Sequence, residues 1–249
     1  MLRFIEATNL LPKNRVIIII HVIIRQLHDW NPNIGEAKQI QLELARQVSR
    51  KNEGNKHFNT VAGVDISGAG PDNTAIAAIV VLSFPDNKIS DIVRTKEKIT
   101  FPYISGFLSF REIPVLISAF KSLTHEPDII MVDGQGIAHP RRFGLASHLG
   151  VLLDIPTIGC AKSRLCGHHE TPENVTGAYT ELIDNDEVIG AVVKTKTNVK
   201  PVYVSIGHKI DLQSSIKYVV QCCSGYRLPE PTRLAHLAAS GKPADTLNN

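Results

Sequence analysis

Four consecutive apolar residues, Ile129 to Val132, run directly into an acid and a glycine-rich turn, and this stretch constrains the fold more than any other. The apolar run has the length and composition of a buried strand. Open α/β sheets bind ligands at the carboxyl ends of their strands, which is where this strand delivers Asp133. An Asp-Gly dipeptide is by itself an ordinary turn signal, so the rest of the chain must decide between a turn and a site.

The segment after Asp133 adds an open main chain and basic side chains. Glycine lets a ligand approach the backbone closely. An acid, an open backbone and basic groups together suit a metal ion that holds a phosphodiester, and we expect the arginines to contact phosphate rather than to cap a helix. The residues concerned are Gly134, Gly136, Gly144, His139, Arg141 and Arg142.

Composition is that of a soluble globular protein, since 43% of the 249 residues are hydrophobic. The net charge is 27 − 24 = +3, which permits a local basic patch without demanding one. The spacing of the four cysteines matches neither a zinc site nor a disulfide framework. We therefore expect reduced thiols and a cytoplasmic protein. The cysteines are Cys160, Cys166, Cys222 and Cys223.

The N-terminal segment contains an apolar run, residues 16–24, that is too short to span a membrane. No small-residue cleavage site follows it, so it is not a typical signal peptide. We divide the chain into an N-terminal extension of unknown role (1–22), a catalytic domain (23–240) and a disordered tail (241–249). Neither membrane association nor an obligate protein partner is expected.

Hydrophobic periodicity predicts a mixed sheet flanked by helices, an α/β fold. The first three strands form an antiparallel meander, and helices alternate with strands after it. The predicted strands are 61–67, 74–84, 89–100, 129–132, 157–161, 188–194 and 202–206. The predicted helices are 31–51, 107–123, 142–153, 212–222 and 233–239, with Pro114 disturbing the second.

Four groups form a candidate active site. Asp65 lies inside an apolar strand, where a charge is costly unless it is paired or binds metal. Asp133 ends the strand expected beside it, a helix brings Glu112, and His236 lies near the C-terminus. Oxygen ligands of this kind hold magnesium, which activates water for attack on a phosphodiester. Glu112 alone would be an ordinary surface charge and His236 an ordinary surface or capping residue, whereas Asp65 is less easily explained in that way. Only the conjunction of the four predicts a metal nuclease.

Six segments, in this order, resemble the motif series of the endonuclease V family, and the similarity covers about residues 25–236. The family has a ribonuclease H-like fold, which agrees with the predicted meander and α/β arrangement. The resemblance implies a Mg²⁺-dependent DNA repair nuclease, with Mn²⁺ as a substitute ion. The segments are 61–65, 101–104, 110–112, 133–141, 161–165 and 229–236.

The implied reaction is hydrolysis of the second phosphodiester 3′ to a hypoxanthine base in DNA, leaving 3′-hydroxyl and 5′-phosphate ends. By resemblance, Asp65 and Asp133 are the principal metal ligands and Glu112 completes the acidic site. His236 assists at the water or at a second metal, and Lys162 lies near the scissile phosphate.

The resemblance also assigns the DNA contacts. Residues 102–104 match a strand-separating wedge, and an aromatic wedge can replace stacking lost when a base leaves the helix. One departure is Ser105, where the wedge usually has proline. Leu108 and Gly144 match positions around the flipped base. The predicted DNA-binding residues are Pro102, Tyr103, Ile104, Leu108, Arg141 and Gly144; we expect His168, His169 and His208 to be surface residues.

Three alternatives stay open. On the same site, the substrate can be inosine in RNA, or in single-stranded DNA, rather than in duplex DNA. A non-catalytic nucleic-acid-binding module would tolerate loss of the acids, whereas all are present. An actin-like kinase also opens with an acid-bearing strand and a glycine-rich turn, as residues 64–68 do, but the chain shows no second phosphate loop.

Overall fold

The computed structural model describes residues 22–52, 57–68, 70 and 72–243. The predicted extension and tail therefore lie outside the described residues, apart from residues 22 and 241–243. The strands are β1 (Thr60–Ile66), β2 (Thr74–Ser83), β3 (Ile89–Lys98), β4 (Ile129–Val132), β5 (Thr157–Ala161), β6 (Tyr179–Asp184), β7 (Glu187–Val193) and β8 (Val202–His208). The helices are α1 (Ile34–Leu44), the 3-10 turn η1 (Ala45–Gln47), α2 (Leu108–Lys121), α3 (Leu145–Leu153), α4 (Leu212–Gln221) and α5 (Glu230–Ala239).

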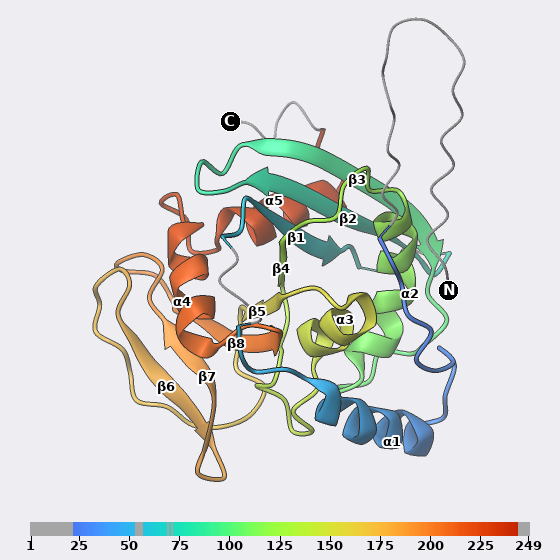
Figure 1. The fold of residues 1–249 in the computed structure, drawn as a ribbon, viewed down its shortest axis with the longest axis horizontal. Helices are drawn as coiled ribbons and strands as arrows, with labels where there is room; N and C mark the ends of the chain where they lie inside the picture. The colour runs from blue at the N-terminus through green and yellow to red at the C-terminus, as the bar shows by residue number, and fades with distance from the viewer. Residues whose placement is uncertain (1–21, 53–56, 69, 71, 244–249) are drawn as a thin grey trace, which may run out of the picture.

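The described strands form one mixed sheet in the order β3-β2-β1-β4-β5-β8-β7-β6 (Figure 1). β1, β2 and β3 are the predicted antiparallel meander. β4 runs parallel to β1, and β5 runs parallel to β4. β8 and β7 continue the sheet in antiparallel fashion to the β6 edge. The α/β mixed sheet predicted from periodicity is therefore confirmed.

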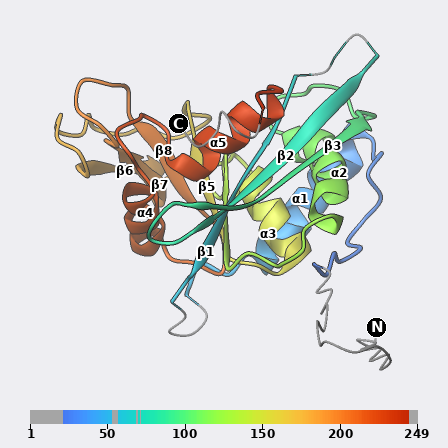
Figure 2. The same ribbon diagram turned by 90° about the horizontal axis from the view of Figure 1, so that it is seen from above.

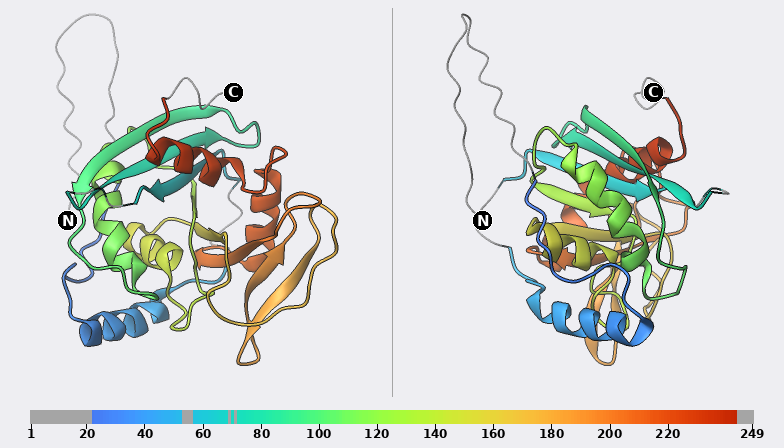
Figure 3. Two further views of the ribbon diagram at one scale, coloured as in Figure 1. Left: turned by 180° about the vertical axis from the view of Figure 1, so that it is seen from behind. Right: turned by 90° about the vertical axis from the view of Figure 1, so that its right-hand side faces the viewer.

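Helices cover both faces of the sheet (Figure 2). Side chains alternate along β1, so Val61 packs into the core beneath α4 and α5, while Ala62 and Val64 pack into the core beneath α2 and α3. In Figure 3 α5 lies along β1 and β2, with which it makes most of its contacts. β4 is buried on both faces, which explains its uninterrupted apolar sequence.

α1 lies outside this sandwich and covers the start of α2 and one side of α3. Asn33 and Glu36 form a capping box at its N-terminus. Its buried positions, Ala37, Gln41 and Leu44, follow helical spacing and contact two small clusters around Phe110 and Phe143. One member of this apolar stripe is thus polar, and Gln41 reappears at the functional site.

Four elements differ from the sequence prediction by three residues or more. α1 was predicted over 31–51, but it begins at Ile34 after the Asn33 cap and ends at Leu44, where the 3-10 turn η1 follows. β6 was not predicted, because only Leu182 in it is buried and the strand lies at the edge of the sheet. α3 begins at Leu145 rather than at Arg142, since Arg142 has a positive φ of 54° that a helix cannot contain. α5 begins at Glu230, because proline is tolerated in the first helical turn.

Two further findings concern the chain as a whole. Among the described residues no helix is both long enough and apolar enough to cross a membrane. All four cysteines are free thiols, as their spacing predicted.

Candidate metal centre and adjoining cavity

β1 and β4 place two carboxylates side by side. The parallel register pairs Gly63 with Met131 and Val64 with Val132, so the next residues on the two strands are Asp65 and Asp133. Their side chains are only 16% and 10% exposed. Two carboxylates this close and this buried are costly unless a cation or hydrogen-bond donors compensate them.

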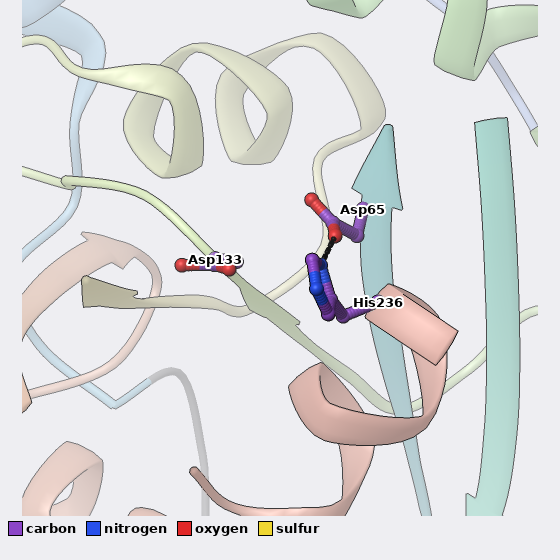
Figure 4. A group of neighbouring side chains, drawn as sticks. All are labelled: Asp65, Asp133 and His236. Carbon is purple, nitrogen blue, oxygen red and sulfur yellow. Dashed lines mark hydrogen bonds and ion pairs between the residues drawn. The ribbon is translucent and has the colours of Figure 1, made fainter. Parts of the chain in front are cut away.

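α5 brings His236 to the same place because Gly63 has no side chain. A Cβ at Gly63 would lie 1.8 Å from the carbonyl oxygen of Pro231, so the start of α5 rests directly on β1. Five residues after Pro231, His236 places its Nδ1 2.7 Å from Asp65 Oδ2. Figure 4 shows this pair with Asp133 beside it. Ligand atoms of these three residues lie within 4.8 Å of one another, which suits a metal site.

Glu112 approaches the two aspartates from α2. Burial, together with the nearby carboxylates of Asp65 and Asp133, raises its pKa to about 8, against a smaller opposing effect of Arg111. Burial also raises the pKa of Asp133, against the opposing effect of Lys162. Negative charge is thus concentrated here in excess, and a divalent cation would relieve it. Glu112 lies outside the tight group of three ligand atoms, so its part in the acidic site stays a prediction.

Lys162 follows β5 and forms an ion pair with Asp133 through its Nζ and Oδ2. The Arg227 guanidinium fixes the backbone of this lysine, since it donates to the Lys162 carbonyl at 2.6 Å and to the Pro201 carbonyl at 2.9 Å. Sequence reasoning did not single out Arg227. It lies in the same C-terminal segment as His236, but nothing local indicates that its target is a carbonyl 65 residues away.

A cavity of about 350 Å³ opens beside the acids. Its lining brings together residues predicted to contact the flipped base, the scissile phosphate and the metal ion. A volume of this size is typical of small-molecule sites. Pro102 and Ile104 lie elsewhere, around a second depression with Ile34 and Phe101. The cavity lining includes Tyr103, Leu108, Asp133, Gln135, Gly144 and Lys162.

Tyr103 stands at the cavity with its side chain in solvent. It is 73% exposed, the most exposed of the large hydrophobic residues described, while Pro102 is exposed and Ile104 is partly buried. An aromatic side chain held in solvent beside a cavity is available for stacking. The wedge assignment is untested by these contacts and stays a prediction.

The loop that carries the wedge is fixed by three donors on one carbonyl. Gln41 Nε2, His139 Nε2 and Arg141 Nη2 lie 3.0, 3.1 and 2.5 Å from the Gly106 oxygen. Gly106 has a positive φ of 78°, which a side chain would strain. The His139 and Arg141 side chains therefore position the loop from inside. Gln41 was missed, although a glutamine in the apolar stripe of α1 was a usable signal.

Arg141 and Arg142, predicted to contact phosphate, already bind other side chains of the protein. Arg141 also bonds Gln41 Oε1 at 2.5 Å and lies over the Phe107 ring, so its DNA contact stays a prediction. Arg142 pairs with Asp184 at 2.9 Å and Glu187 at 2.6 Å, and a phosphate would have to displace these acids.

The three histidines predicted to be surface residues differ in how exposed they are. His168 is exposed and His169 partly so, as expected. The prediction for His208 was wrong: it is 4% exposed at the end of an interior strand, where its Nδ1 accepts from the Ser49 amide.

Comparison with known proteins gives one consistent result. The family model described as Endonuclease V matches residues 42–237. The curated Endonuclease V of Trichormus variabilis is 50% identical over 219 residues, covering 88% of this chain and 99% of that protein. The chain belongs to the endonuclease V family. Family membership makes it a nuclease and a hydrolase.

Solved endonuclease V structures share the fold. The Streptomyces avermitilis enzyme has a TM-score of 0.80 at 36% identity, covering 85% of this chain and 93% of that one. The Ciona intestinalis enzyme has a TM-score of 0.74 at 32% identity, covering 83% and 95%. That protein was solved with a 24mer DNA containing an inosine followed by a ribo-adenosine. The ribonuclease H-like fold expected for the endonuclease V family is thereby confirmed.

Proposed function

We propose that this protein is a Mg²⁺-dependent DNA repair endonuclease that recognises deoxyinosine and hydrolyses the second phosphodiester 3′ to it, leaving 3′-hydroxyl and 5′-phosphate ends. The observation that carries the proposal is the position of the Asp65–Asp133–His236 cluster beside a cavity of about 350 Å³, a volume typical of small-molecule sites. The Ciona intestinalis relative bound to inosine-containing DNA supports the choice of base.

The side chains fit a divalent cation by their chemistry. Asp65 and Asp133 supply oxygen ligands of the kind magnesium prefers. Burial, and then neighbouring carboxylates, raise the pKa of Glu112 and of Asp133, so their charged forms would be stabilised by a cation. When bound, the ion would supply Lewis-acid chemistry at the phosphate, with Mn²⁺ as a substitute. His236 would orient the Asp65 carboxylate through their hydrogen bond and assist proton movement at the attacking water.

The remaining residues have binding roles in this proposal. Lys162 lines the cavity and pairs its Nζ with Asp133, where it can neutralise a phosphate oxygen. Tyr103 would stack in the gap left by the displaced base. Leu108 and Gly144 line the cavity, so their main-chain groups can meet the edge of the base.

The second candidate function is cleavage of inosine-containing RNA at the same site. It is favoured by the ribo-adenosine that follows the inosine in the Ciona intestinalis complex. The cytoplasmic location predicted from the reduced thiols is compatible with either substrate.

The test is a cleavage assay with Mg²⁺ on end-labelled DNA and RNA strands, each with and without one inosine. We expect one nick, at the second phosphodiester 3′ to inosine, in wild type and none in Asp133→Ala. The preferred strand decides between the two substrates. Absence of any inosine-dependent nick would refute both, and binding without cleavage would point to a non-catalytic module.

A further inference from the structure

A buried histidine, a partly buried histidine and a buried serine form a row of hydrogen bonds behind the cavity. His148, in α3, is fully buried, and its Nδ1 lies 2.9 Å from Ser109 Oγ. Its Nε2 lies 2.8 Å from Nε2 of His28, whose Nδ1 lies 2.7 Å from the Asp29 carbonyl oxygen. The Trp30 ring stacks on His148. None of these residues serves the metal centre.

The donor and acceptor roles along this row of hydrogen bonds are fixed by its first member. A carbonyl oxygen can only accept, so His28 must carry a proton on Nδ1. Burial lowers the pKa of both imidazoles, which keeps them neutral with one proton each. Nε2 of His28 is then bare and accepts from Nε2–H of His148. Nδ1 of His148 is bare in turn and accepts the hydroxyl proton of Ser109.

The direction matters because Ser109 is also part of the cavity wall. Its hydroxyl proton is committed to His148, so its oxygen offers the cavity only acceptor capacity. The 6-oxopurine ring of hypoxanthine carries a hydrogen on N1, whereas adenine presents a lone pair there. An acceptor-only oxygen therefore attracts the deaminated base and repels N1 of the ordinary one.

We propose that Ser109 is a specificity-determining residue whose Oγ accepts a hydrogen bond from N1–H of a 6-oxopurine, and that His148 and His28 are positioning residues that hold it as an acceptor. This inference rests on the proposed function, since it assigns the base to the cavity. It adds a side-chain contact, controlled from outside the cavity, to the recognition of the base edge.

The first experiment compares hypoxanthine with unsubstituted purine, which lacks N1–H, at one position of a DNA strand. We expect Ser109→Ala to lower kcat/KM about tenfold for hypoxanthine and to leave it unchanged for purine, because one hydrogen bond is lost only with the first base. An equal fall for both bases, or no fall for either, would overturn the proposal.

Ser147→Ala is the matched control. Ser147 is also fully buried, and its hydroxyl has no partner among the described residues and lies outside the cavity lining. We expect no change of kcat/KM with either base. Thermal denaturation of both variants separates loss of stability from loss of selectivity.

The second experiment measures the tautomers directly by NMR of the imidazole nitrogens in the free protein. We expect His148 to carry its proton on Nε2 and His28 on Nδ1, and His28→Phe to weaken the preference for hypoxanthine over purine. A proton on Nδ1 of His148 would overturn the proposal that Ser109 is held as an acceptor, even in an active enzyme. Absence of inosine-dependent cleavage by the wild-type protein would instead refute the proposed function, and it would not affect the tautomer result.

Discussion

Asp133 lies between opposing influences, since burial disfavours its charge while Lys162 favours it. Asp133→Asn keeps the shape and removes a metal ligand. We expect the fold to persist and cleavage to fall by at least about a thousandfold, the scale on which metal ligation supports phosphoryl chemistry. Single-turnover cleavage with Mg²⁺ measures this. Asp86→Asn, an exposed turn residue, is the control that should stay fully active.

Substitution of Tyr103 should affect DNA binding much more than it affects stability. Because its side chain is 73% exposed, Tyr103→Ala should change the free energy of unfolding by less than about 0.5 kcal/mol. Loss of one stacking contact should weaken binding of inosine-containing DNA by about 1–3 kcal/mol. Fluorescence anisotropy measures the affinity. Tyr179→Ala removes another exposed aromatic away from the cavity, and equal weakening by both variants would contradict the wedge role.

His139 makes stability depend on pH. Burial and then Arg141 lower its folded pKa to about 4, while the unfolded value is about 6.5. Between these values only the unfolded chain takes up the proton, so stability is full above about pH 6.5 and falls as pH drops toward 4, by about 3 kcal/mol from this residue. Urea denaturation across this pH window should show that the unfolding free energy of His139→Gln falls less with decreasing pH than that of wild type. Identical curves would contradict the assignment.

At the scale of elements, the contact between β1 and α5 assembles the site. Gly63→Ala places a methyl group where the Pro231 carbonyl lies, so α5 must move away from β1 and carry His236 with it. We expect a loss of about 3 kcal/mol or more in unfolding free energy and a fall in kcat. Gly68→Ala, with open space around its Cβ, is the control. Wild-type stability in Gly63→Ala would show that the helix yields without cost.

The elements also explain why a loop beside the cavity keeps one shape. Gln41 of α1 and the segment before α3 both bind the Gly106 carbonyl, so two elements far apart in sequence hold the loop that carries Tyr103. An exposed aromatic on a mobile loop would lose entropy on binding, whereas this one is already positioned.

At the scale of the molecule, folding gathers three carboxylates that repel one another, and metal binding should return part of that free energy. A ligand specific to the folded state at one hundred times its Kd stabilises by about 2.7 kcal/mol. Mg²⁺ should therefore raise the melting temperature of wild type and leave that of Asp65→Asn nearly unchanged. Differential scanning calorimetry with and without EDTA measures this. An equal rise in both proteins would place the ion elsewhere.

The order of elements was determined by the sequence itself, because apolar periodicity is a local property. Strands such as Ile129–Val132 and Thr157–Ala161 are buried on both faces and were predicted to the residue. β6 was missed because an edge strand needs few buried residues. The two acids were also predictable, since a charge within or at the end of an apolar strand is anomalous without a partner.

The tertiary structure alone decided which polar side chains meet. Gln41, Arg227 and His148 look ordinary in the sequence, because the hydrogen-bond partners of their side chains lie at least 26 residues away. Two of the three, Gln41 and Arg227, bind main-chain carbonyls. His208 was misjudged for the same reason, since burial at the end of a strand depends on what packs over it. Local sequence specifies propensity and pattern, whereas a hydrogen bond between distant groups exists only after packing has brought donor and acceptor together.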